Sequence, residues 1–144
     1  GLEIQRPEVA DVQIKQPVGF DMARLEEVES NPCDGRENQR RSRAIIVNTM
    51  VYLSGQYADD TDVGIKGQAE QILHKIDTLL VEAGTDRSKL VQATIWLKTM
   101  DDYDGFNDVW DAWVIPDHMP TRACGEVRMA DDDMLVEIIA VAAL

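Results

Sequence analysis

The stretch KLVQATIWLKTMDDYDGFNDVWDAWVIP, residues 89–116, changes its hydrophobic period partway along. Over 91–98 apolar and polar residues alternate, which predicts a β-strand with one apolar side. The apolar side consists of Val91, Ala93, Ile95 and Leu97. Further on, apolar residues recur three or four positions apart, which predicts an amphipathic helix. Its apolar residues are Tyr103, Phe106, Val109, Trp110, Trp113 and Val114.

The same stretch contains signals for both ends of this helix. Asp101 is expected to cap the first turn, and Asp104, three residues on, forms a short capping box with it. Pro116 is expected to end the helix, because the residue before a proline is driven away from helical geometry.

A longer amphipathic helix precedes this stretch. Asp62 is the expected N-cap, and Gly84 stands where a glycine usually ends a helix. The apolar residues between them recur at spacings of three and four: Ala69, Ile72, Leu73, Ile76, Leu79, Leu80 and Ala83.

Strand-like runs flank these two helices. AIIVN (44–48) and MVYLSGQ (50–56) predict a hairpin that turns at Asn48-Thr49. Two more strands are expected at 121–129 and 134–143, and a short edge strand at 23–29. Helices that alternate with strands, with hairpins at both ends, predict an α+β fold in which one mixed sheet is backed by two helices.

Composition and charge limit the number of domains and the classes of partner. The 144 residues, 44% of them hydrophobic, suit one domain at 22–144, and the aperiodic residues 1–21 are expected to be an extension or arm. Acidic residues outnumber basic ones by 27 to 14, and the charge of −13 argues against a nucleic-acid partner.

The sequence contains neither a membrane-length apolar run nor a signal-peptide pattern, so a cytoplasmic protein without a membrane partner is expected. Cys33 and Cys124 match no zinc or CxxC spacing.

Ionisable residues within the two C-terminal strands are the candidates for chemistry. In 121–129, alternation places Arg122, Cys124, Glu126 and Arg128 on one face. The planar guanidinium of Arg122 matches a carboxylate bidentately. The alternative is a structural ion pair of Arg122 with Glu126 or with Glu137.

Glu137 lies in an apolar run, LVEII. A carboxylate there must be paired, protonated or open to a cavity, because an unpaired buried charge costs several kcal/mol. In a cavity Glu137 could accept a proton or orient a water; the alternative is the outer face of a strand edge. Cys124 has no histidine near it in sequence, so an apolar wall residue is favoured over a nucleophile. No histidine spacing indicates a metal site, and no glycine-rich phosphate loop is present.

Taken together, these residues resemble the RidA (YjgF) family of enamine/imine deaminases over residues 38–144. The resemblance is carried by four segments: VYLSGQ (51–56), LLVEAG (79–84), VQATIWLKTMDDYDGFNDVW (91–110) and PTRACGEVRMADDDMLVEIIAVA (120–142). Its most specific element is the P-x-R-x-C block followed at this distance by V-E-I.

The resemblance implies a chorismate-mutase-like fold that assembles as a homotrimeric barrel with a cleft between neighbouring subunits. It also implies roles for four residues. Arg122 binds the substrate carboxylate, Cys124 and Asn107 line the pocket, and Glu137 helps to hold the attacking water. The implied reaction converts a 2-aminoacrylate-type enamine, through its imine, into a 2-keto acid and ammonia without a cofactor.

The sequence departs from the family pattern in the N-terminal hairpin. Family members that are active usually carry Gly-Pro-Tyr-Ser where this chain has Gln39-Arg40-Arg41-Ser42, so Arg41 replaces the tyrosine. If Arg41 lies near a neighbouring subunit's Arg122, it could bind a second carboxylate, which predicts a preference for imines of dicarboxylic amino acids. The alternative is that Arg41 projects into solvent. Three functions remain open: a deaminase, a non-catalytic carboxylate-binding protein, and a ribonuclease or translation inhibitor, against which the negative charge weighs.

Overall fold

The computed structural model describes residues 23–24 and 41–144. The expected N-terminal extension, most of the predicted strand at 23–29, and Cys33 lie outside these residues. The described elements are β1 (Ala23–Arg24), β2 (Ala44–Val47), β3 (Met50–Leu53), α1 (Ile65–Glu82), the 3₁₀ turn η2 (Arg87–Lys89), β4 (Leu90–Leu97), the 3₁₀ turn η3 (Met100–Asp102), α2 (Tyr103–Trp113), β5 (Thr121–Glu126) and β6 (Val136–Ala143).

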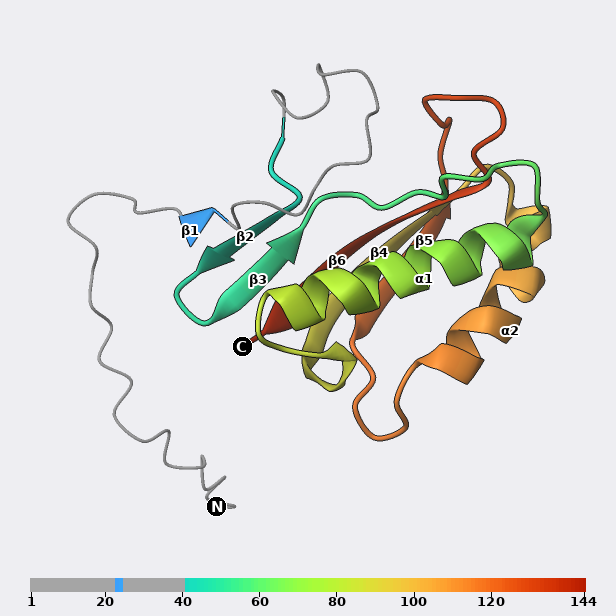
Figure 1. Cartoon of the computed structure of the whole chain (residues 1–144). Helices are drawn as coiled ribbons and strands as arrows, with labels where there is room; N and C mark the ends of the chain where they lie inside the picture. The colour runs from blue at the N-terminus through green and yellow to red at the C-terminus, as the bar shows by residue number, and fades with distance from the viewer. Residues whose placement is uncertain (1–22, 25–40) are drawn as a thin grey trace, which may run out of the picture.

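The strands form one mixed sheet in the order β1-β2-β3-β6-β4-β5, and both helices cover the same face of it (Figure 1). Only β4 and β5 pair in parallel; every other neighbouring pair is antiparallel. Helix α2 therefore connects parallel neighbours, and α1 connects β3 to β4, which run in the same direction on either side of β6. Crossovers of this kind are right-handed, which explains why both helices lie on one face. The predicted order of elements is confirmed.

The hairpin turn and the end of α1 form as the sequence predicts. Asn48, at a positive φ of 56°, begins the two-residue turn between β2 and β3, and asparagine tolerates this conformation well. At the end of α1, Gly84 has φ 86° and donates its N–H to Val81, while Thr85 donates to Leu80. This bonding is the Schellman motif that glycine favours.

Both predicted N-caps are wrong. Helix α1 begins after Gly64, and the Asp62 N–H donates instead to the Asp60 side chain in the preceding loop. Before α2, Thr99 accepts from the Asp101 N–H and caps the turn η3, so the α-helix begins only at Tyr103. In both places neighbouring polar residues compete for the same backbone donors.

The three later strands differ from their predicted faces or lengths. A register shift between Leu90 and Gln92 buries Leu90 and leaves Val91 43% exposed, so Val91 does not share the inner face of β4. This irregularity has the character of a β-bulge, which alternation alone does not reveal. Strands β5 and β6 are shorter than predicted because β4, their common partner, ends at Leu97.

The hydrophobic core lies between the helices and the covered face of the sheet. Its largest buried side chains include Phe106, Ile72, Leu73, Ile76, Leu79, Leu80, Ile95, Leu97 and Ile138. Neither helix within residues 23–24 and 41–144 combines the length and the apolar character that a membrane span requires.

Gln68, on α1, is a buried polar residue that joins two loops. It is 1% exposed. Its Nε2 donates to the carbonyls of Thr61, Val63 and Asp133 at 3.2, 3.3 and 2.9 Å, and its Oε1 accepts from the Leu135 N–H at 2.9 Å. The side chain thus fixes the loop before α1 against the turn that leads into β6.

We expect Gln68→Leu to lower the free energy of unfolding by about 2–4 kcal/mol, because leucine leaves buried backbone groups without partners. Urea unfolding followed by circular dichroism measures this loss. Gln71→Leu is the matched control. Gln71 also bonds to a loop backbone, at Asp60, but at the exposed surface, so we expect a loss below about 1 kcal/mol. Equal losses in the two variants would contradict the role given to Gln68.

Candidate functional site

Arg122 and Cys124 lie on the helix-covered face, on the edge strand β5. In the parallel pairing, Arg122 is opposite Ala93 and Cys124 is opposite Ile95. Ala93 and Ile95 are both buried in the core. Paired residues on neighbouring strands share a face, so the two predicted site residues of β5 point toward α2.

The Arg122 guanidinium is held by residues of α2. Its Nη2 donates to the Asn107 side-chain oxygen, Oδ1. Its central carbon lies 5.9, 5.5 and 5.3 Å from the ring centroids of Tyr103, Phe106 and Trp110. The structure therefore brings together two predicted site residues, Arg122 and Asn107. It also places three aromatic rings around the guanidinium, which the sequence predicted only as the apolar face of a helix.

The expected alternative of an ion pair for Arg122 is wrong. Within the described ranges, Arg122 forms no salt bridge, and neither Glu126 nor Glu137 contacts it. The Glu126 carboxylate instead accepts from the Met100 N–H at 3.1 Å. Arg122 remains a partly buried cation whose protein partners are a neutral amide and three rings.

Glu137 lies on the opposite face of the sheet. It is paired with Trp96, and its neighbours Val136 and Ile138 point into the core, so its own side chain points to the face without helices. A Cβ atom on Gly55 would lie 2.0 Å from the Glu137 Oε1. The carboxylate therefore rests against the Gly55 backbone, and β6 is a central strand rather than the edge considered from the sequence.

Burial and Arg41 act on Glu137 in opposite directions. Burial raises the pKa of the Glu137 carboxyl, and the positive charge of Arg41 partly lowers it. The Arg41 guanidinium carbon lies 5.7 Å from the centroid of the Tyr57 ring. The charge of Arg41 thus acts on Glu137 of the same chain, but burial prevails, so the carboxyl retains its proton to higher pH than an ordinary glutamate.

The predicted site residues therefore form two separate groups. Arg122, Asn107 and Cys124 lie together on the helix-covered side at the sheet edge, whereas Glu137 lies on the open face, where the charge of Arg41 acts on it. Strand β4 separates the strands that carry Arg122 and Glu137. Because the two groups lie on opposite faces of the sheet, a single chain does not bring both of them to one small ligand.

Cys124 is half-buried and packs against the core, as expected of a wall residue. Its thiol is free. In the part of the chain that the structure describes, no cluster of histidine, cysteine and acidic residues is suited to a metal ion.

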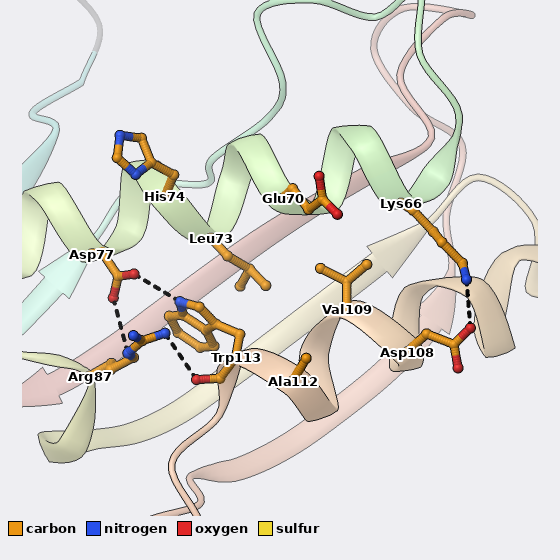
Figure 2. A pocket seen from close by; sticks show the side chains of 10 residues that line it. All are labelled: Lys66, Glu70, Leu73, His74, Asp77, Arg87, Asp108, Val109, Ala112 and Trp113. Atoms are coloured by element: carbon orange, nitrogen blue, oxygen red, sulfur yellow. Dashed lines mark hydrogen bonds and ion pairs between the residues drawn. The ribbon is translucent and has the colours of Figure 1, made fainter.

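A groove of about 490 Å³ lies elsewhere, between α1 and α2. Figure 2 shows its two ends closed by side-chain contacts: Lys66 with Asp108 at 2.7 Å, and Arg87 with Asp77 at 3.6 Å. Trp113 closes the second end further, because its Nε1 donates to Asp77 at 2.9 Å. None of the predicted site residues lines this groove.

The sequence alone did not identify Gly55 or the three rings around Arg122 as parts of these groups. For Gly55, the sequence offered only its place in the SGQ segment. For the rings and Asn107 the spacing could have indicated a common site, because positions 103, 106, 107 and 110 share one helix face.

Comparisons with known proteins agree with this fold. The family model described as Endoribonuclease L-PSP matches residues 37–144. A RutC family protein of Haemophilus ducreyi is 38% identical over 105 residues, which cover 73% of this chain and 90% of the relative. A RutC family protein of Escherichia coli is 32% identical over 105 residues, 73% of this chain and 91% of the relative.

Two solved structures resemble the chain closely. An uncharacterized protein from Pseudomonas aeruginosa superposes with a TM-score of 0.75 at 38% identity, covering 85% of this chain and 97% of that one. A YjgF family member from Neisseria meningitidis superposes with a TM-score of 0.70 at 38% identity, covering 72% and 87%.

Proposed function

Because this chain belongs to the Endoribonuclease L-PSP family, which includes the YjgF and RutC proteins, we propose that it is an enamine/imine deaminase. Its substrates are imines of the 2-aminoacrylate type, and its products are 2-keto acids and ammonia. The observation that carries the proposal is Arg122, a partly buried cation that no carboxylate of the described residues neutralises.

Arg122 is suited to bind the substrate carboxylate. A guanidinium has five N–H donors in a planar fork, and Asn107 uses a donor on one nitrogen only. A carboxylate fits such a fork with two parallel hydrogen bonds, which lysine cannot reproduce. A bound substrate carboxylate would thus be fixed in both position and orientation.

Glu137 is suited to hold the water that attacks the imine. The enamine first tautomerises to the imine by proton transfer to carbon. The water oxygen then adds to the C=N carbon while Glu137 accepts one of its protons and passes it to the nitrogen. A further proton from solvent makes the nitrogen a leaving group, and the C–N bond breaks to release ammonia as the hydroxyl loses its proton and becomes the keto group. A well-placed base of this kind contributes typically about 10²–10⁴-fold in rate. Fixing the carboxylate and the water in one site adds the advantage of proximity.

The open face of the sheet supports a homotrimer, with an active site between neighbouring subunits. Both helices lie on one side, so the other face has no cover within the described chain (Figure 1). That face carries apolar side chains, among them Trp96, Ile139, Val141 and Tyr52, the last 48% exposed. Burying it against another copy would remove this surface from water. In the trimer, Arg122 of one subunit approaches Glu137 of the next.

We expect Arg122→Lys and Glu137→Gln to damage different steps. Arg122→Lys keeps the charge but loses the fork, so kcat/KM falls at least about tenfold and 2-keto acid binding weakens. Glu137→Gln lowers kcat about 10²-fold while the 2-keto acid still binds, because Arg122 is intact. The assay generates imines in situ from amino acids and measures keto acid formed, with calorimetry for binding. A wild-type protein that binds keto acids without hydrolysing imines would support the non-catalytic alternative.

Mixing the same two variants tests whether the site is shared. In a trimer assembled at random from equal amounts of both, about one site in four combines an intact Arg122 with an intact Glu137 from a neighbour. We therefore expect about a quarter of wild-type activity to return after the subunits are exchanged and reassembled. Sedimentation should give a trimer for each protein. A monomer, or no recovered activity from mixed trimers, would contradict the shared site.

Arg41 takes the position where the resemblance leads one to expect a tyrosine. Its charge acts on Glu137 of the same chain. A second substrate carboxylate would compete with Glu137 for this cation. We therefore propose a different role from the dicarboxylate preference expected from the sequence: the charge of Arg41 keeps Glu137 ionised at lower pH than burial alone would permit.

We expect Arg41→Tyr to move the acidic limb of the kcat/KM profile to higher pH. Without the cation, the pKa of Glu137 rises further, so the active carboxylate appears only at higher pH. The ratio of kcat/KM for a dicarboxylic imine to that for the alanine-derived imine should change less than about threefold, within the range of an exposed charge contact. A larger change toward the small imine would instead establish Arg41 as a second carboxylate site.

The ribonuclease alternative has one point in its favour, since the family description names an endoribonuclease. The net charge of −13 opposes it, because a phosphate backbone is repelled on average by such a chain. Neither group of site residues resembles a phosphate-binding site, since each contains a single arginine.

A further inference from the structure

We propose that Tyr103, Phe106 and Trp110, together with Asn107, form a cradle that positions Arg122 for an incoming carboxylate. This inference rests on the proposed role of Arg122 and assigns four positioning contacts to it. The cradle residues are spaced so that all of them lie on one face of α2. That face lies against β5, where the Arg122 side chain meets it.

The burial of the rings makes this cradle rigid. Phe106 and Trp110 are buried in the core, so their rings cannot move away when a ligand arrives or leaves. Tyr103 is 39% exposed and lies at the solvent side of the cradle. The guanidinium is thereby restricted before a ligand binds, which reduces the ordering cost of binding.

Rings and a neutral amide hold the cation without neutralising it. Aromatic rings attract a guanidinium through their quadrupole, yet they supply no formal negative charge. Arg87 shows the contrast within the same protein. It lies 5.4 Å from the Trp113 ring centroid but is also paired with Asp77 at 3.6 Å. Arg87 is therefore a structural arginine, whereas Arg122 keeps its charge for an anion.

Asn107 sets the orientation of the fork. Its Oδ1 accepts from Nη2 of Arg122 and so fixes the rotation of the guanidinium plane. An aspartate at this position would have nearly the same shape and would add a negative charge. Asn107→Asp would then create an internal ion pair that competes with the ligand, an effect that a merely structural residue would not produce.

The experiment measures the Kd of 2-oxobutanoate for the assembled protein by calorimetry, alongside KM and kcat. We expect Asn107→Asp to weaken binding at least about tenfold without loss of thermal stability. Tyr103→Leu should weaken binding about threefold, through KM rather than kcat, and Tyr103→Phe, which keeps the ring, should recover most of that loss. The matched control is Gln71→Glu, which also replaces an amide by a carboxylate but at the exposed surface of α1, and it should bind like wild type.

The outcomes separate the cradle from the proposed function. Wild-type-like binding in both Asn107→Asp and Tyr103→Leu overturns the cradle, as does a wild-type protein that does not bind 2-oxobutanoate. A loss in Tyr103→Leu that Tyr103→Phe shares fully also overturns it, because the ring would then not be the cause. If wild type binds 2-oxobutanoate with the expected variant pattern but hydrolyses no imine, the cradle stands and the deaminase proposal fails.

Discussion

The alternation of side chains along β6 is the constraint on which the structure depends. This strand pairs with β3 on one side and β4 on the other, so it joins the N-terminal hairpin to the two crossover units. Its residues Val136, Ile138, Ala140 and Ala142 all point into the core beneath the helices. A shift of one residue would expose that apolar set, so the register is strongly fixed. The same register directs Glu137 to the open face.

Much of the fold could be predicted from the sequence because it rests on local periodicity. The change of hydrophobic period over 89–116 predicts a strand and then a helix, and the glycine after α1 predicts the helix end. Both signals depend only on residues that are close together in the sequence. The two N-caps could not be chosen correctly, since adjacent polar residues compete for the same donors and tertiary packing decides between them. Alternation predicts the wrong face for Val91, because a bulge changes the register without changing the composition.

For the candidate site too, the identity of several residues could be predicted from the sequence, but their arrangement could not. Its members Arg122, Glu137 and Asn107 could be selected from the sequence, since ionisable residues in apolar strands and a family resemblance mark them. Their arrangement could not, because it depends on the parallel register of β4 with β5 and on which helix covers the edge strand. The aromatic stripe of α2 has the pattern of an ordinary core face. Only the position of Arg122 beneath it shows that the stripe also surrounds a cation.

The contact between Gly55 and Glu137 links two positions that are far apart in the sequence. Because a Cβ on Gly55 would collide with the carboxylate oxygen, a side chain at 55 and a glutamate in this rotamer at 137 exclude each other. A side chain at position 55 would therefore force the carboxylate into another rotamer, so the glycine determines where the Glu137 carboxylate lies on the open face.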